Sequence, residues 1–407
     1  MKNFKQILKL ALASAMSLAI LTSSLMIVSA DPGLVDNGTE GTSAVGTLSK
    51  FLEVTNGVEI PDLTFSYLFT KVSVDNNAST EAKATMPNLS TTTAFTEGQT
   101  GTAGTGDQTG FNLLDSDSPN FLLGASWPHA GAYVYNVTEV ADVSETLGTK
   151  QSITYSEAMY EMIVYVANKS AYDNTMYVAA IEYRIKKDDA GETASGDKAD
   201  PVFTNRYNVL TDLVISKTVA GDYGDLTRKF DYSVTLNKSP AETAETPTYI
   251  GKIYNISNPG PSGTQIGSNI TVAFDAADTF KTVNGIKLAH NEYIVFESLP
   301  TGTTYTVTEN LNDAVRPGEK DYLPSVIVTE NGGIPTAGPA GTAGASLIVP
   351  VTNLGEGDNV AAFTNTHQDP SITGILINNL PYIMMILLAV GGLVAYIALK
   401  RRKANRF

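Results

Sequence analysis

The sequence predicts an all-β protein built from β-sandwiches, on three observations. Short segments alternate polar and apolar side chains and are rich in Val, Ile, Thr, Tyr and Phe, as half-buried strands are. Stretches rich in Gly, Thr, Ser and Pro separate these segments, as loops do. No apolar pattern of helical period continues for a useful length. Short strands at this spacing are typical of sandwiches.

The alternation places individual elements along the chain. Strands are expected at Thr64–Phe69, Ile163–Val166, Met176–Ile185, Phe230–Leu236, Tyr293–Phe296 and Tyr305–Thr308. Loops are expected at Glu97–Gly110 and Asn331–Gly344, and a few helical turns near Ser156–Glu161.

The two ends of the chain predict an extracellular location. Residues 1–30 carry three lysines, then an apolar run, then Ser29-Ala30, which is the order of a secretory signal peptide. Leu380–Leu399 has no charged residue and is long enough for a transmembrane helix. The basic tail Lys400–Arg406 should remain cytoplasmic. The body is therefore expected outside the membrane.

Composition excludes several classes of function. The chain has 407 residues, with 42 Asp and Glu against 27 Lys and Arg, and a formal net charge of −15. Such an acidic body repels polyanions, so nucleic acid is not an expected partner. There is no cysteine and there are only three histidines, which leaves little for disulfides, thiol chemistry or a metal site. No nucleophile elbow or phosphate loop is present, so we expect neither a cofactor nor an enzyme with an external substrate.

An internal repeat divides the body into two parts. Three short strand signals occur in the same order in each part, and each places one polar residue on the same face as its apolar neighbours at i±2. These residues are Lys50, Glu139 and Asn205 in the first part, and Lys217, Glu309 and Asn365 in the second. We therefore expect two domains of like topology, at residues 31–208 and 209–368, joined near Tyr207–Asp212.

Burying these polar residues has a chemical consequence. Burial lowers the pKa of a lysine and raises that of a glutamate, which leaves a nucleophilic amine beside a protonated acid. The amine can attack the carboxamide carbon of an asparagine while the glutamate acts as general acid and base, and ammonia leaves. A Lys–Asn isopeptide bond remains.

The segment before the expected membrane span also carries a motif. Asp369–Ile375, followed by the apolar span and the basic tail, resembles a cell-wall sorting signal of Gram-positive bacteria. In that family the transpeptidase sortase cleaves between Thr and Gly, which implies a cut between Thr373 and Gly374. Ser371 stands where the common Leu-Pro-x-Thr-Gly pattern has proline. The last expected unit is thus residues 369–407, containing the sorting signal, the helix at 380–399 and the tail.

The repeated strand signals resemble the isopeptide-forming domains of T-antigen-type backbone pilins and of collagen-adhesin B-type repeats. The resemblance implies two tandem inverse immunoglobulin-like sandwiches, with a Lys50–Asn205 bond assisted by Glu139 and a Lys217–Asn365 bond assisted by Glu309. It also implies a sortase-polymerised major pilin whose partners are sortase, further pilin subunits and peptidoglycan. In similar pilins the acceptor lysine lies shortly before the closing strand of the first domain, which points to Lys198. Lys150, Lys169, Lys186 and Lys187 are alternatives.

A second hypothesis is a monomeric wall-anchored adhesin that binds a host protein or a glycan. The long loop-like stretch Thr91–His129 contains the single tryptophan, Trp127, and is where such a ligand would bind. A ladder of high-mass species on denaturing gels would separate the pilin from the monomer.

Overall fold

A computed structural model of the chain describes residues 34–35, 38–39, 42–143, 146–170, 173–255, 264–368 and 385. The expected signal peptide, the sorting residues Thr373 and Gly374, and nearly all of the expected span at 380–399 lie outside the described residues. Within the described ranges, no helix is long and apolar enough to cross a membrane.

The described part of the chain consists mainly of strands, which confirms the predicted all-β class. The first half contains β1 (Leu34–Val35), β2 (Ser49–Thr55), β3 (Leu63–Val74), α2 (Thr80–Thr85), β4 (Thr92–Phe95), β5 (Thr102–Ala103), η1 (Gly106–Gln108), β6 (Phe111–Asp117), β7 (Gly131–Val143), β8 (Gln151–Thr154), β9 (Met159–Ser170) and β10 (Asp173–Lys187). Strand β11 (Val202–Ala220) follows. The second half contains β12 (Phe230–Asn237), β13 (Thr248–Asn255), β14 (Ile266–Ala273), β15 (Phe280–Leu288), β16 (Glu292–Pro300), β17 (Thr304–Asn310), η2 (Glu319–Asp321), β18 (Tyr322–Thr329), β19 (Thr336–Ala337), β20 (Leu347–Asn353) and β21 (Asn359–His367).

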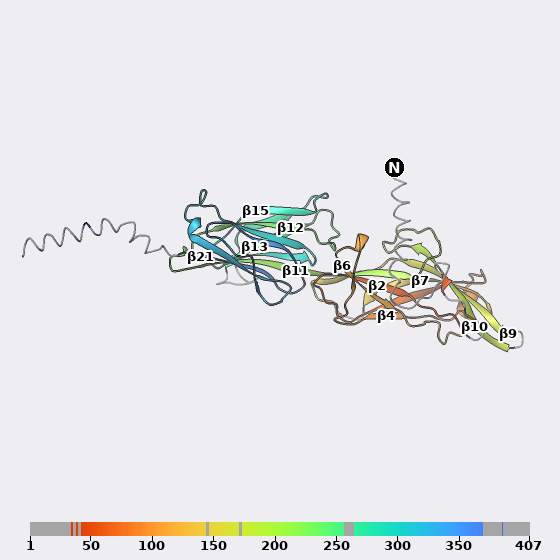
Figure 1. Cartoon of the computed structure of the whole chain (residues 1–407). Helices are drawn as coiled ribbons and strands as arrows, with labels where there is room; N and C mark the ends of the chain where they lie inside the picture. Colours follow the sequence, from red (N-terminus) through yellow and green to blue (C-terminus); the bar gives the residue numbers. More distant parts are fainter. Residues whose placement is uncertain are drawn as a thin grey trace, which may run out of the picture.

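Strand β11 connects the two halves of the molecule. It is 19 residues long, and every second residue from Phe203 to Val219 is buried, as strand periodicity requires. Its first part pairs with β2 and β8, and its second part pairs with β16 and β21. The junction expected near Tyr207–Asp212 is therefore the middle of one continuous strand. Figure 1 shows the two halves arranged end to end with β11 between them.

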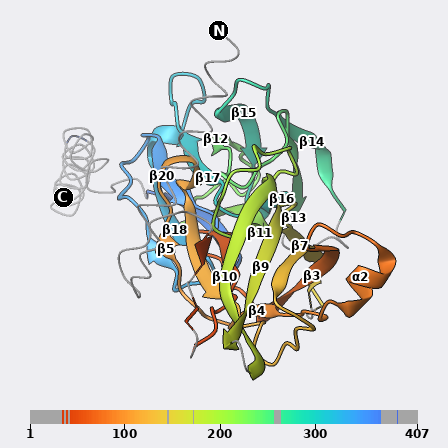
Figure 2. The same ribbon diagram turned by 90° about the vertical axis from the view of Figure 1, so that its right-hand side faces the viewer.

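Each half packs one sheet against another. In the first half the sheet β1-β10-β9-β7-β3-β4 covers the sheet that contains β11, β2, β6 and β5. In the second half the sheet β15-β12-β17-β20 covers β14-β13-β16-β11 and the adjoining β21 and β18. The short helix α2 has no buried residue and lies at the periphery when the molecule is viewed along its long axis (Figure 2). The cores therefore form between sheets.

The two halves use the same strand pairing around the polar residues of the repeat. Strand β2 runs parallel to the first part of β11, with Lys50 opposite Phe203. Strand β21 runs parallel to the second part of β11, with Lys217 opposite Phe363. In both pairs the Asn lies two residues after that Phe, so that the Lys and the Asn are on neighbouring strands and the same face.

Contacts across the junction hold the halves together. The hydroxyls of Thr55 and Thr301 share a hydrogen bond of 2.6 Å in a buried position. The Thr301 N–H donates to the Val209 carbonyl at 2.9 Å. The Glu356 N–H donates to the carbonyl of Gly57 at 3.0 Å. These bonds supplement the continuity of β11 and oppose bending between the halves.

The expected strands are all present, but two expectations about irregular segments are wrong. Residues 155–158 have no helical turn, and β9 begins at Met159, because pairing with β7 and β10 draws this segment into a sheet. The stretch Thr91–His129 is not simply a loop, since it contains β4, β5 and β6. Strand β6 pairs with β2 along its whole length. Pairing with β2, more than the residue types of β6, makes this segment a strand.

Candidate functional site

The first cluster joins both sheets of the N-terminal half. Lys50 comes from β2 and Asn205 from β11, while Glu139 comes from β7 in the opposite sheet. The Lys50 Nζ lies 2.6 Å from Glu139 Oε1, and Asn205 Nδ2 donates to the same oxygen at 2.9 Å. The side chains of Lys50 and Glu139 are 0% exposed, and Asn205 is buried. The predicted burial is confirmed for all three.

The second cluster repeats this geometry in the C-terminal half. Lys217 lies on β11, Asn365 on β21 and Glu309 on β17 of the facing sheet. The Lys217 Nζ lies 2.6 Å from Glu309 Oε1, and Asn365 Nδ2 donates to that oxygen at 2.9 Å. The hydroxyl of Tyr232 also donates to it, at 2.9 Å. All three repeat residues of this half are buried as well.

Each lysine lies over an aromatic ring that sequence reasoning missed. The Lys50 Nζ is 4.8 Å from the ring centre of Phe65, and the Lys217 Nζ is 4.2 Å from that of Phe230. A tyrosine two residues further along the same strand lies opposite the Glu of its cluster, Tyr67 in β3 and Tyr232 in β12. The signal was present in the sequence, because Phe-x-Tyr recurs in the second strand of each half.

Burial sets the protonation of these groups. It lowers the pKa of Lys50 to about 8 and that of Lys217 to about 8, although the nearby Glu139 and Glu309 oppose the change. Burial also raises the pKa of Glu139, against the effect of Lys50, Asn205 and the Ser156 N–H. Each amine is therefore much closer to its neutral form at neutral pH than an exposed lysine is.

One carboxylate oxygen contacts both nitrogens in each cluster. The amine that would attack and the amide nitrogen that would leave are both within hydrogen-bond distance of the same Oε1. A proton taken from Nζ can therefore be delivered to Nδ2 by one acid. The other oxygens, Glu139 Oε2 and Glu309 Oε2, are buried and have no hydrogen-bond partner among the described residues. At Glu139, whose pKa burial raises, this arrangement favours the protonated acid, because an unpaired buried charge is costly.

Lys198 lies at the outer edge of β10. It forms a backbone bridge with Arg184, and hydrogen bonds from the Ile185 N–H to Asp197 and from the Ala199 N–H to Tyr183 hold its backbone on both sides. Its side chain is 30% exposed, and its Nζ lies 3.6 Å from Oε2 of the largely buried Glu182.

The alternative lysines lie elsewhere on the first half. Lys150 pairs with Asp212 at 2.7 Å, and Lys186 pairs with Glu161 at 3.1 Å. Lys169 lies on β9 and Lys187 on β10.

Trp127 is not placed as a ligand-binding site requires. It is 7% exposed and its ring packs against Tyr133, with 4.7 Å between ring centres. It borders a small cleft of about 160 Å³, but an indole buried this far cannot stack on a sugar.

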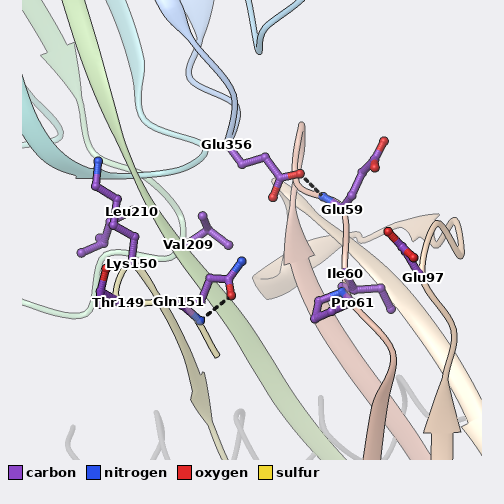
Figure 3. Close-up of a pocket in the computed structure, with 11 residues that line it drawn as sticks. Glu59, Ile60, Pro61, Glu97, Thr149, Lys150, Gln151, Val209, Leu210 and Glu356 are labelled. Atoms are coloured by element: carbon purple, nitrogen blue, oxygen red, sulfur yellow. Dashed lines mark hydrogen bonds between the residues drawn. The ribbon is translucent and has the colours of Figure 1, made fainter. Parts of the chain in front are cut away.

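A larger cleft lies at the junction of the two halves. Its volume is about 560 Å³, and Glu59, Glu97 and Glu356 contribute to its lining together with Lys150. Glu356 accepts a hydrogen bond from the Glu59 N–H at 3.1 Å (Figure 3). Burial, and secondarily the charge of Glu59, raise the pKa of Glu356. Within the described ranges, no group of His, Asp and Glu has an arrangement that could hold a metal ion.

Comparison with known proteins finds a family match in each half. Residues 47–208 match the Spy0128-like isopeptide containing domain. Residues 211–337 match a family described as a domain of unknown function (DUF7601).

The chain is also similar to individual proteins. The chain is 23% identical over 270 residues to a protein named pilin from Streptococcus pyogenes serotype M1, covering 66% of this chain and 68% of that protein. Among solved structures, the major pilin from Streptococcus pyogenes is similar at 20% identity over 82% of this chain and all of that one, with a TM-score of 0.33. A pilus-presented adhesin, Spy0125 (Cpa), is similar at 19% identity over 52% of this chain and 37% of that one, with a TM-score of 0.25. The family match and the related pilin confirm the resemblance expected from the sequence.

Proposed function

We propose that this chain is a structural subunit of a sortase-assembled pilus, the major pilin, and that each half closes itself with a Lys–Asn isopeptide bond. The halves are two tandem domains of inverse immunoglobulin-like topology, over residues 31–208 and 209–368. A signal peptide at 1–30 directs secretion, and residues 369–407 carry the sorting signal and a temporary membrane anchor. The role is structural, and the only reaction of the body is on itself.

The observation that carries the proposal is the shared carboxylate oxygen in both clusters. Glu139 Oε1 contacts Lys50 Nζ and Asn205 Nδ2, and Glu309 Oε1 contacts their counterparts in the second half. In each reaction the Nζ–Cγ bond forms and the Cγ–Nδ2 bond breaks. One proton moves from Nζ to Nδ2 through the acid, and ammonia leaves. The balance needs no oxidant, reductant or co-reactant.

The positions of the bonds suit a protein under tension. Asn205 and Lys217 both lie on β11, and each bond joins the first long strand of its half to the last. Pulling force would therefore pass through covalent bonds and β11, and the sheets would not have to unzip. In the chain-entropy model, closing loops of this size stabilises each half by about 5 kcal/mol. A chain without cysteine would gain a crosslink that reduction cannot break.

Polymerisation requires an amine that receives Thr373 of another subunit. We infer that this amine is Lys198, because its backbone is fixed to β10 while its side chain remains partly exposed. Glu182 lies close enough to orient the amine, and Arg184 in turn holds Glu182, with 2.6 Å from its Nε to Oε1. Sortase, further copies of this chain and, at the base of the fibre, peptidoglycan are the implied partners.

The intact mass of residues 31–373 tests the proposal. The wild-type fragment should lack the mass of two ammonia molecules. Glu139→Ala and Glu309→Ala should each restore one of them, because each acid serves only its own cluster. A wild-type fragment of full mass would reject both crosslinks.

A gel of the cell wall separates the pilin from the monomeric adhesin. The pilin predicts a ladder of high-mass species under denaturing conditions, and the adhesin predicts a single band. Trp127 is buried, so the stretch Thr91–His129 does not offer an exposed indole to a glycan.

A further inference from the structure

The two clusters differ in how the Asn carbonyl is held. Asn205 Oδ1 accepts a hydrogen bond from the backbone N–H of Ser156 at 2.7 Å in a buried position. Asn365 Oδ1 is also buried but has no hydrogen-bond partner among the described residues. The two clusters otherwise match, but only in the first is the Asn carbonyl that the lysine would attack hydrogen-bonded by a described residue.

A break in strand pairing explains the difference. In the first half, β8 ends at Thr154, opposite Arg206 of β11, and the chain leaves the ladder before Ser156. In the second half, β18 continues past the equivalent point, with Ser325 opposite Thr364 and Pro324 opposite Asn365. The early end of β8 allows the Ser156 N–H to turn toward the Asn205 side chain.

Asp189 fixes the segment that carries this donor. Its Oδ1 accepts a hydrogen bond from the Ser156 hydroxyl and another from the Thr204 N–H, the latter at 3.0 Å. Its backbone carbonyl accepts from the Glu157 N–H at 3.0 Å. The Ser156 hydroxyl also accepts from the Ala158 N–H at 3.1 Å. Asp189 thus ties the turn at Ser156 to the residue that precedes Asn205.

We propose that the Ser156 N–H is a fourth catalytic group of the N-terminal cluster, that Asp189 is its positioning residue, and that the N-terminal bond consequently forms faster than the C-terminal one. The inference rests on the proposed self-crosslinking. When Lys50 attacks Asn205, negative charge develops on Oδ1. A fixed N–H at 2.7 Å from that atom stabilises the charge, as the donors of an oxyanion hole do.

The same bond also orients the carboxamide before reaction. With Oδ1 held by Ser156, Nδ2 is directed to Glu139, which must protonate it as it leaves. In the second half, the extra hydrogen bond goes to the acid instead, from Tyr232 to Glu309. It does nothing for the charge that develops on the Asn365 carbonyl oxygen.

The experiment follows both crosslinks in one chain. Never-folded residues 31–373 from urea-solubilised inclusion bodies are diluted into buffer, stopped in acid at intervals and digested. The two crosslinked peptides are quantified by mass spectrometry. The rate at which the C-terminal bond forms is an internal control for folding and for sample handling.

Two substitutions remove the donor in different ways. Ser156→Pro has no N–H, and we expect it to slow the N-terminal bond about 100-fold, the usual effect of losing one oxyanion donor. Asp189→Ala should release the segment that carries Ser156 and slow formation of the N-terminal bond about tenfold. This effect is smaller than that of Ser156→Pro, because the N–H donor is displaced but still present. Asp189→Asn should restore most of the rate, since an amide oxygen can accept the same two bonds. The C-terminal bond should keep its wild-type rate in all three.

Matched controls separate positioning from general stability. Asp188→Ala alters the turn at residues 188–192, which contains Asp189, because Asp188 accepts from the Ala190 and Glu192 N–H groups, but it should leave both rates unchanged. The loss of folding stability in Asp189→Ala is measured by thermal unfolding in a Glu139→Ala background, where no N-terminal crosslink forms.

The outcomes separate this inference from the proposed function. An unchanged N-terminal rate in a folded Ser156→Pro chain, or in Asp189→Ala where Ser156→Pro does not fold, overturns the role of Ser156. A wild-type chain whose N-terminal bond forms no faster than its C-terminal bond overturns the order. If instead the wild-type chain loses no ammonia, the crosslinking itself is rejected.

Discussion

Replacing Glu309 by alanine should leave the C-terminal half without its crosslink. The carboxylate is completely buried, and its Oε1 is the atom through which the proton passes from Lys217 to the leaving nitrogen of Asn365. Without that acid the amide bond remains. The fragment 31–373 should then lack one ammonia molecule where the wild type lacks two.

The loss of stability can be worked out from the structure. The missing loop closure costs about 5 kcal/mol in the chain-entropy model. The buried amine and amide left without their acceptor add about 1–3 kcal/mol each. For a domain of this size, the lost loop closure alone, about 5 kcal/mol, lowers the midpoint of thermal unfolding by roughly 10–20 °C, and the unpaired groups lower it further. Lys217→Met also prevents the bond but leaves no unpaired ammonium, so it should lower the midpoint less.

Scanning calorimetry and intact mass on the same samples test these values. Glu297→Ala is the matched control: it breaks an ion pair with Lys252 in which both side chains are about one third exposed, and such surface pairs contribute little to stability. It should leave the mass unchanged and the midpoint nearly so. A Glu309→Ala protein that still lacks two ammonia molecules, or that unfolds at the wild-type temperature, would refute the reasoning.

Four further predictions follow from the same geometry. The rate of N-terminal crosslinking should be nearly constant around neutral pH and fall above pH about 8. Burial lowers the pKa of Lys50 to about 8 and raises that of Glu139, so this pair shares one proton near neutral pH and loses it above pH about 8. A rate that keeps rising from pH 8 to 10 in the refolding assay would show that the neutral amine alone is limiting. Tyr232→Phe removes a donor to Glu309 and should slow the C-terminal bond several-fold while sparing the N-terminal one, measured on the same digests. Lys198→Ala should abolish the sortase-dependent ladder on denaturing gels, whereas Lys186→Ala should keep it; the reverse pattern identifies Lys186 as the acceptor. Asn359→Ala should destabilise the C-terminal half by about 2–4 kcal/mol in urea unfolding, since this buried amide donates to Thr211, Gly355 and Gly357; Asn353→Ala, at the surface, should cost far less.

Several features of the site could be predicted from the sequence because they depend on local periodicity. A residue in a strand shares its face with the residues at i±2, so the neighbours of Lys50 and Lys217 already indicated that both point inward. The repeat then indicated that each half has its own Lys, Glu and Asn. The Phe-x-Tyr pair near each lysine is equally visible in the sequence, at Phe65 and Tyr67 and at Phe230 and Tyr232.

Other features depend on the surroundings of a segment. Strand β6 lies within the stretch Thr91–His129, for which the sequence predicts a loop, because its polar residues Asp115 and Asp117 mask an alternation that pairing with β2 completes. The helical turns expected after Ser156 are absent for the same reason, since β9 is held between β7 and β10. Local propensity is weak enough for tertiary pairing to override it.

The sequence by itself determined the strand period, the burial of the six polar residues and the chemistry open to them, because these follow from residue type and spacing. Only the tertiary structure decided that one oxygen of each acid contacts both nitrogens, and that one Asn carbonyl has a donor while the other has none. Those facts depend on which strands become neighbours and on where a ladder stops. The partners are separated by 89 residues for Lys50 and Glu139 and by 49 for Ser156 and Asn205, and no local pattern specifies contacts at such separations.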